Sequence, residues 1–424
     1  MQNSLPDNRG STTQDSTIQS LPKQAFVGLQ MLFVAFGALV LVPLIVGLDS
    51  NTALLTAGIG TLLFQLCTRR QVPIFLASSF AFIAPMQYGI ATWGLSVTMG
   101  GLMFAGLVYI GLSGLVKLKG AGILQRVFPP VVVGPIIIII GMGLAPLAVN
   151  MAIGKGGDGT QIYPYEQAIL ISMVTLLTTL IVAVFTKGLM KLVPIMFAIT
   201  IGYILSLFFG LVDFSAVAAA PWFSVPTLTT PEFKLEAILY LLPIAIAPAI
   251  EHVGGIMAIS SVTGKDFLKQ PGLHRTLLGD GIATSAASFL GGPPNTTYAE
   301  VTGAVMLTRN FNPSIMTWAA CWAIAISFCG KVGAFLATIP TVVMGGIMML
   351  VFGSIAVVGM STLIKAQVNV SAPRNLCIIS VVMTFGIGGM MLNVGEVSLK
   401  GISLCAIVAV IMNLVLPKDL DDNV

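Results

Sequence analysis

The stretch GGPPNTTYAEVTGAVMLTR, residues 291–309, places helix-breaking residues and a carboxylate inside an otherwise apolar region. A Gly-Gly-Pro-Pro run cannot continue a helix, so NTTY is expected to be extended and a short helix to begin near Ala299. The free amides at the start of such a helix carry partial positive charge. Within a membrane, backbone broken in this way is tolerated only where it lines a cavity, so this stretch predicts one.

The composition indicates that the surroundings are a membrane. Of the 424 residues 56% are hydrophobic and only 8% are charged, against roughly 25% charged in an average soluble domain. We therefore expect a polytopic membrane protein. The net charge of +4 comes from basic residues spread singly between apolar runs, so no nucleic-acid partner is expected. The five cysteines lack metal-ligand spacing, and neither a metal nor a cofactor is expected.

The chain contains about fourteen candidate membrane segments, if each needs about 20 apolar residues. In the first half they are 25–48, 52–67, 73–89, 93–116, 129–153, 168–186 and 192–214. In the second half they are 236–260, 277–291, 295–308, 313–336, 338–364, 376–392 and 401–416.

The distribution of basic residues predicts the orientation of these segments. With fourteen spans, only Lys155, Lys234 and Lys400 of the 20 basic residues fall on the side opposite the termini, and Lys331 is not assigned to a side. The positive-inside rule then places both termini in the cytoplasm. The first 22 residues are polar and lack the apolar core of a signal peptide.

Two pairs of sequences suggest an internal repeat. FPPVVVGPIII (128–138) matches IPTVVMGGIMM (339–349), and SSFAF (78–82) lines up with TTYAE (296–300) at a similar offset of about half the chain. Two halves of seven spans each must cross the bilayer in opposite senses, because seven is odd. Inverted repeats with interrupted helices at corresponding places are typical of secondary transporters.

Two carboxylates lie within apolar sequence, Glu251 in IAIAPAIEHVGGIM and Glu300 in the opening stretch. A charge at the bilayer centre is costly unless it is paired, neutralised by a proton or exposed to a wet cavity. The helix breakers near both favour a binding site, with carboxyls that merely hold helices together as the alternative. Asp280, at the mouth of its segment and close to Arg275, is expected to be a capping or ion-pair group.

The paired stretch QVPIFLASSFAFIAP (71–85) should break in the same way as the opening one. The two broken segments would then meet near mid-membrane. Together they would offer helix-start amides, the aromatic faces of Phe80 and Tyr298, and the two carboxylates. This chemistry suits a small flat ring with N–H donors and C=O acceptors.

A set of motifs along the chain resembles the nucleobase–ascorbate transporter family, in its bacterial uracil permease branch, over about residues 23–416. The motifs are FGALVLVP (36–43), SSFAFIAP (78–85), EHVG (251–254), PGLHR (271–275), NTTYAE (295–300) and GAVMLTR (303–309).

The resemblance implies an all-α polytopic fold of fourteen transmembrane segments, arranged as two inverted seven-segment repeats with short antiparallel strands in segments 3 and 10. It also implies a core domain (23–120 and 236–336) and a gate domain (121–235 and 337–416). The resemblance also implies a homodimer through the gate domain. From their composition, residues 1–22 are expected to be a disordered cytoplasmic tail, and residues 417–424 a second cytoplasmic tail.

The resemblance further implies a substrate-binding set. Its members are Glu251, Glu300, Phe80, Ala299, Tyr298 and Ser79, with His252 and Thr297 supporting them from behind. Glu251 and Glu300 would accept hydrogen bonds from a base ring. The amides of Phe80 and Ala299 would donate to its carbonyl oxygens, and Tyr298 would pack on its face.

Some positions depart from the family pattern. Val301 replaces an asparagine, Ala299 replaces a glycine, and Met31 and Gly255 stand where many relatives have histidines. Coupling to protons through those histidines is unavailable, so a carboxyl, Glu251 or Glu300, would have to carry the proton. His252 points about 100° away from Glu251 around a helix and is expected to be a packing or supporting residue.

We therefore expect a multi-pass transporter of the bacterial cytoplasmic (inner) membrane that imports uracil by proton symport. Glu251 would take the proton and Glu300 would recognise the ring, unless Glu251 only binds substrate and the proton moves elsewhere. A xanthine or other purine permease of the same fold and sodium coupling are the alternatives. An anion transporter would not need two opposing carboxylates, and no catalytic constellation of an intramembrane enzyme is present.

Overall fold

A computed structural model describes residues 21–120, 122–156, 159–394 and 397–417. For residues 125, 189, 299, 300, 393, 394, 397, 398 and 400 it describes the backbone only. Nearly all of both predicted tails therefore lies outside the described residues.

The first half of the chain is helical apart from one short strand. Its elements are α1 (Leu21–Val46), α2 (Ser50–Cys67), β1 (Leu76–Ser78), η1 (Phe80–Phe82), α3 (Ile83–Trp93), α4 (Leu95–Lys119), α5 (Gly122–Val127), α6 (Pro130–Ala152), α7 (Tyr165–Phe185), η2 (Gly188–Leu192), α8 (Pro194–Phe208) and α9 (Ser215–Ala219).

The second half has a similar make-up, with a further strand hairpin near its end. Its elements are α10 (Leu235–Leu241), η3 (Leu242–Ala245), α11 (Ile246–Thr263), η4 (Leu268–Gly272), α12 (Leu273–Phe289), β2 (Asn295–Thr297), α13 (Ala299–Thr308), α14 (Ser314–Ser327), α15 (Gly330–Ala337), α16 (Thr341–Lys365), α17 (Pro373–Ile387), β3 (Met391–Val394), β4 (Val397–Lys400) and α18 (Ile402–Val415).

Seven helices of the described residues are long and apolar enough to cross a membrane: α1, α2, α4, α6, α7, the continuous 235–263 stretch and α16. Four shorter apolar helices, α8, α14, α17 and α18, accompany them. These helices agree with a multi-pass membrane protein. The count of fourteen spans stays a prediction.

Two details of the predicted segments are wrong. The range 313–336 is not one helix, because the backbone becomes extended at Cys329 and bridges to Phe223 between α14 and α15. The end of the range 376–392 is not helical either, because β3 and β4 form an antiparallel hairpin there, with Met391 opposite Lys400. Both features depend on pairing between backbone segments, which the apolar pattern does not encode.

Helices α6 and α16, which carry one of the repeated sequence pairs, lie antiparallel against each other. Each begins after an extended proline, Pro129 or Pro340. Gly134 faces Gly359 near one end of the crossing and Gly345 faces Ala152 near the other. The small residues let the backbones approach closely, as in many membrane helix pairs.

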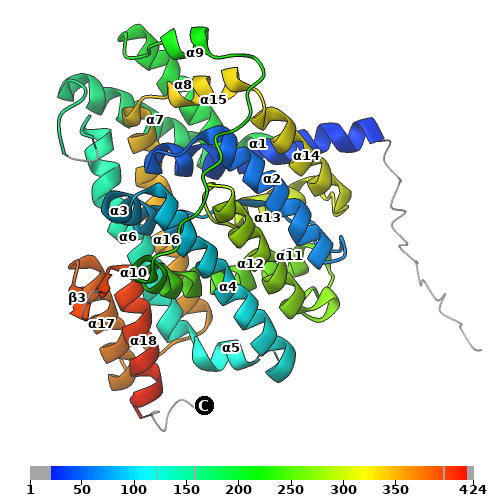
Figure 1. Ribbon diagram of the computed structural model, residues 1–424, viewed down its shortest axis with the longest axis vertical. Helices are drawn as coiled ribbons and strands as arrows, with labels where there is room; N and C mark the ends of the chain where they lie inside the picture. Colours follow the sequence, from blue (N-terminus) through cyan, green and yellow to red (C-terminus); the bar gives the residue numbers. More distant parts are fainter. Residues whose placement is uncertain (1–20, 121, 157–158, 395–396, 418–424) are drawn as a thin grey trace, which may run out of the picture.

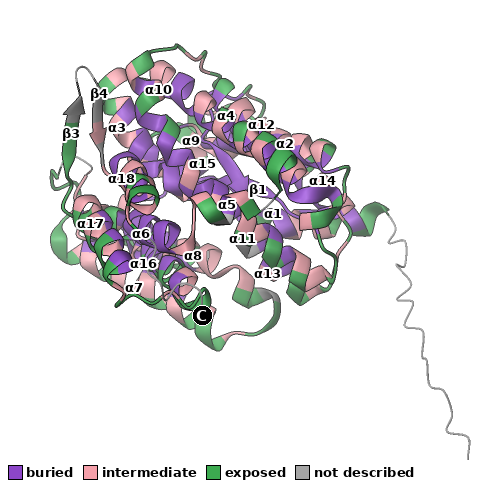
Figure 2. Ribbon diagram, turned by 90° about the horizontal axis from the view of Figure 1, so that it is seen from below, coloured by how far each residue is buried: buried purple, intermediate pink, exposed green. Residues whose placement is uncertain are grey.

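A second group of helices packs around α2 and α12. Helix α12 lies between α4 and α2, and α14 lies against α2 and α1. Figures 1 and 2 show this group on one side of the molecule, while α6, α16, α17 and α18 lie on the other. The strand β1 lies among buried residues in the interior (Figure 2), which places the broken segments inside the protein rather than on its surface.

The α6–α16 crossing generates a test of the packing. A Cβ atom at Gly141 would collide with the backbone of Phe352 and Ala356, whereas a Cβ at Gly143, two residues along the same helix, meets nothing. We expect Gly141→Ala to destabilise the protein by about 1–3 kcal/mol, because the clashing atoms are backbone and cannot move aside. Thermal unfolding of the purified protein in detergent measures this loss.

Gly143→Ala is the matched control. Alanine is favoured over glycine within a helix by up to about 1 kcal/mol, so its midpoint should stay equal or rise. Equal midpoints for the two variants would contradict the close crossing.

Candidate functional site

The opening sequence stretch forms a turn and a short strand between α12 and α13. Gly291 has φ of +86°, a conformation that favours glycine, and it turns the chain after α12. A Cβ at Gly292 would collide with Thr56 of α2, so only glycine lets the chain pass there. Pro293 and Pro294 then lead into β2, whose three residues are all buried.

The two broken segments meet as an antiparallel strand pair. In its register Leu76 lies opposite Thr297, Ala77 opposite Thr296 and Ser78 opposite Asn295. Two further backbone bonds extend the pair: Ser79 N–H donates to the Pro294 oxygen at 2.9 Å, and Tyr298 N–H donates to the Phe75 oxygen at 3.1 Å.

Side chains of the neighbouring helices satisfy the outer edges of this pair. The Leu76 amide donates to Thr61 Oγ1 of α2 at 3.0 Å, and Thr284 Oγ1 of α12 donates to the Asn295 oxygen at 2.6 Å. The Asn295 side chain in turn donates from Nδ2 to the Thr56 oxygen at 2.8 Å. A buried backbone group without a partner is costly, so these threonines are what allows a two-stranded ladder to exist here.

A helix starts directly after each strand. Ser79 precedes η1 and α3, and Tyr298 precedes α13, so both helix starts flank the strand pair. Ser79 and Tyr298 are buried and Phe80 is half-buried. Ala299 and Glu300 open α13, but their side chains lie outside the described residues. The structure thus brings the backbone of both predicted half-sites together.

Helix α11 lies beside β2 and α13 and carries the other predicted carboxylate. Glu251 is exposed on the same open face as Gly254 and Ala258, which follow at helical spacing. The neighbouring His252, about 100° further round the helix, is fully buried. One turn of α11 therefore presents an open carboxylate on one side and a buried imidazole on the other.

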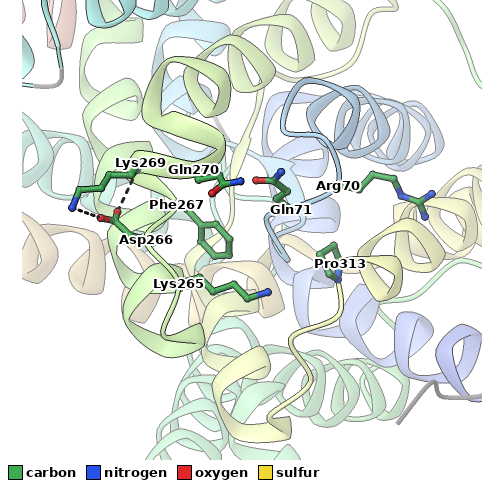
Figure 3. Close-up of a pocket in the computed structure, with 8 residues that line it drawn as sticks. All are labelled: Arg70, Gln71, Lys265, Asp266, Phe267, Lys269, Gln270 and Pro313. Atoms are coloured by element: carbon green, nitrogen blue, oxygen red, sulfur yellow. Dashed lines mark hydrogen bonds and ion pairs between the residues drawn. The ribbon is translucent and has the colours of Figure 1, made fainter. Parts of the chain in front are cut away.

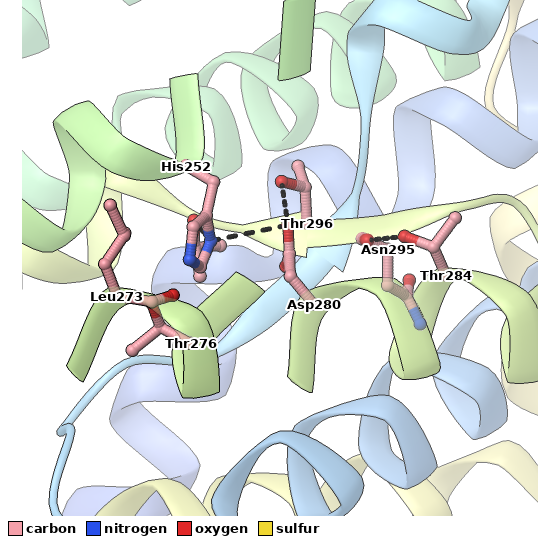
Figure 4. Close-up of polar contacts among 8 residues, drawn as sticks. His252, Leu273, Thr276, Asp280, Thr284, Asn295 and Thr296 are labelled. Atoms are coloured by element: carbon pink, nitrogen blue, oxygen red, sulfur yellow. Dashed lines mark hydrogen bonds and ion pairs between the residues drawn. The ribbon is translucent and has the colours of Figure 1, made fainter. Parts of the chain in front are cut away.

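The buried side of α11 holds a polar cluster (Figure 4). His252 Nδ1 lies 3.1 Å from Thr297 Oγ1 and 3.4 Å from Asp280 Oδ2. Thr296 Oγ1 donates to the same carboxylate oxygen at 3.2 Å. The cluster joins α11, α12 and β2.

The position and the partner that the sequence suggested for Asp280 are wrong. Asp280 is fully buried near the middle of α12, and its partner is His252 rather than Arg275. The Arg275 guanidinium instead contacts the Cys67 oxygen at 3.4 Å. Sequence proximity suggested the wrong pair, because residues five apart on a helix face different directions. The three consecutive polar residues of β2, NTT, could have predicted that buried polar partners lie nearby.

The positions that depart from the family pattern also lie near the strands or in the core. Val301 and Met31 are buried. A Cβ atom at Gly255 would lie 3.4 Å from Thr297 Oγ1, in ordinary contact. Position 255 therefore faces the same strand residue that His252 contacts.

A pocket of about 570 Å³ opens elsewhere, beyond the ends of α2 and α11 (Figure 3). Its lining includes Arg70, Lys265 and Lys269, and Asp266, which pairs with Lys269 at 3.4 Å. None of the predicted site residues lines it. Among the described residues no group of histidine, cysteine or acidic side chains is arranged to hold a metal ion.

A family model and the relatives found by sequence comparison all describe permeases. The Permease family model matches residues 22–395. The probable uracil permease of Pasteurella multocida is 80% identical over 94% of this chain and 95% of its own length. The uracil permease of Bacillus caldolyticus is 43% identical over 92% and 91% of the two chains. These relatives are named as permeases, that is transporters, and not as enzymes.

A solved structure shows a similar fold. The transmembrane domain of the cyanobacterial bicarbonate transporter BicA superposes with a TM-score of 0.63, covering 92% of this chain and 96% of that domain. At 18% sequence identity this likeness concerns the fold alone.

The threonine contact at the strand edge yields a direct test. Thr284→Val keeps the side-chain shape but leaves the buried Asn295 oxygen without its donor, so we expect a loss of about 1–3 kcal/mol. Amides of residues 295–298 should also exchange faster with deuterated solvent. Both thermal unfolding and hydrogen exchange report the change.

Thr178→Val in α7 is the control, because that hydroxyl bonds only to the Val174 oxygen of its own helix. It should change stability by less than about 0.5 kcal/mol. Unchanged exchange in Thr284→Val would show that the strand edge does not need this donor.

Proposed function

This chain belongs to the Permease family, within which its motifs are those of the nucleobase–ascorbate transporters, and we propose that it imports uracil across the bacterial cytoplasmic membrane together with protons. Full-length similarity to proteins named uracil permeases supports the substrate. The seven long apolar helices support the membrane location.

The observation that carries the proposal is the buried antiparallel pair β1–β2, with a helix starting after each strand and Glu251 on the helix beside it. Helix starts supply N–H donors, and a carboxylate supplies acceptors. A uracil ring has two carbonyl oxygens and two N–H groups within one plane. The two sets of groups are complementary.

In this proposal each site residue has a separate task. The Phe80 and Ala299 amides donate to the carbonyl oxygens of the ring, and Glu251 and Glu300 accept from its N–H groups. Tyr298 packs on the ring face and Ser79 closes the site beneath it. His252 and Thr297 hold these residues in place from behind.

Proton coupling follows from the charge of the substrate. Uracil is neutral at neutral pH, so the membrane potential cannot drive its accumulation unless a cation moves with it. A carboxyl at the substrate site is the group best able to take up and release a proton during transport, because Met31 and Gly255 replace the family's histidines. We assign this task to Glu251, which lies on the open face of α11, and recognition of the ring to Glu300.

The transport cycle would use the two halves of the fold. The antiparallel contacts of α6 with α16 and of β1 with β2 are the arrangement that two inverted repeats would produce. The core domain, residues 23–120 and 236–336, would carry the site past the gate domain, residues 121–235 and 337–416. A homodimer formed through the gate domain would hold that domain in a fixed position. Both termini would lie in the cytoplasm.

Uptake into proteoliposomes tests the function. With an acidic exterior, we expect labelled uracil to accumulate above its external concentration, and a protonophore should abolish the accumulation. Excess unlabelled xanthine should not compete, and replacing sodium by choline at constant pH should change nothing. Competition by xanthine would instead favour a purine permease, and loss of uptake in choline would favour sodium coupling.

Glutamine variants test the two carboxylates. Glu251→Gln should abolish accumulation driven by the pH gradient, because the amide cannot carry a proton. Glu300→Gln should weaken uracil binding by at least about tenfold, since a hydrogen bond to a charged acceptor is worth about 1.5–3 kcal/mol. Glu166→Gln, at an exposed helix start, is the control and should behave like the parent protein. Accumulation that survives Glu251→Gln would refute the role of this carboxyl.

A further inference from the structure

Two ionisable side chains are fully buried behind the proposed site and take no part in contacting the substrate. His252 of α11 and Asp280 of α12 each have 0% exposed side-chain surface, and Nδ1 and Oδ2 are 3.4 Å apart. Figure 4 shows them pointing toward each other beside β2. Burying charged groups costs free energy, so the presence of this pair in the interior suggests a role.

The pair is tied to the strand that leads into the site. Thr297 Oγ1 lies 3.1 Å from the imidazole and Thr296 Oγ1 donates to the carboxylate at 3.2 Å. Thr297 is followed directly by Tyr298, the residue that begins the site. Any change in the pair is therefore passed to the position of β2.

The charge of the pair follows from its burial. A neutral imidazole, with its single ring proton, beside an ionised carboxylate would leave one net negative charge in a site without water contact. With one further proton the pair is neutral overall, whichever member holds it. Among the described residues, His252 Nε2 and Asp280 Oδ1 have no hydrogen-bond partner that could spread this charge further.

Few other ionisable groups near His252 and Asp280 could balance a charge on the pair. From α4, the fully buried Tyr109 hydroxyl lies near Asp280, Glu251 and Thr296. From α2 comes only the edge of the Phe64 ring, with centroids 6.2 Å apart. Helices α6 and η3, also against α11, have no ionisable residue, and η4 carries Lys269, which is exposed and pairs with Asp266. Glu300 on α13 has a side chain outside the described residues.

We propose that His252 and Asp280 share one proton and act as a positioning pair, whose protonated form holds β2 in the binding arrangement. Losing this proton leaves an uncompensated buried negative charge beside β2, which destabilises the binding arrangement and weakens substrate binding as the pH rises. By linkage, bound substrate raises the affinity of the pair for its proton. This inference rests on the proposed function, and it adds a second proton-sensitive group behind Glu251.

The protonation of His252 can be measured directly in the parent protein. The chain has only two histidines, so ¹⁵N-histidine labelling gives two sets of imidazole signals, and His274→Gln assigns them. We expect both ring nitrogens of His252 to carry protons in the binding form, and the Nδ1 signal to shift in Asp280→Asn. An unprotonated Nδ1 that ignores Asp280→Asn at every pH overturns the proposal.

Equilibrium binding of labelled uracil across pH gives the functional test. His252→Gln leaves the carboxylate without its imidazole partner, so affinity at alkaline pH should fall at least about tenfold and should fall less in acid. Adding Asp280→Asn to this variant should restore affinity at all pH values, because two amides can bridge the threonines without charge. Asp280→Asn alone should bind with a flattened pH dependence.

Asp213→Asn is the control, since that exposed carboxylate contacts only Ser215 at 2.8 Å. Wild-type affinity and pH dependence in His252→Gln, or no rescue by the second change, would overturn the pair's role. Failure of pH-driven uptake in the parent protein, with the histidine signals and the rescue as expected, would refute the symport proposal and leave the pair standing.

Discussion

Backbone that leaves a helix inside a membrane must find every hydrogen-bond partner within the protein, and this requirement governs the centre of the molecule. The strands β1 and β2 satisfy each other on their inner edges. Thr61 and Thr284 satisfy their outer edges from α2 and α12. With the ladder held on both sides, the two helix starts that follow it are fixed in space. The backbone amides at these two helix starts are therefore held in fixed positions.

The same arrangement separates two kinds of acidic group. Glu251 lies on an exposed face of α11, whereas Asp280 lies fully buried against His252. The first can exchange with its surroundings directly. The second can act only through the threonines of β2. A transporter that must bind a neutral ring and a proton in the same state would benefit from both, because each coupling adds to the other.

The fold alone does not identify the transported substrate. A bicarbonate transporter domain shares the fold at 18% identity, so very different sequences produce these helix crossings. Chemistry is set by a few side chains placed on the fold. This is why the motifs around Glu251 and residues 295–300 identified the family, while the apolar pattern missed the break at Cys329 and the β3–β4 hairpin.

The sequence by itself determined the membrane character, the positions of most helices and the two places where helices break. Apolar runs, prolines and glycines act locally, so their effects can be recognised without coordinates. Only the tertiary structure decided which polar groups meet. Asp280 lies close to Arg275 in the chain but contacts His252, and Thr56, Thr61 and Thr284 gave no sign of supporting the strands. Such contacts join residues far apart in the chain, and burial selects them because an unpaired polar group is costly there.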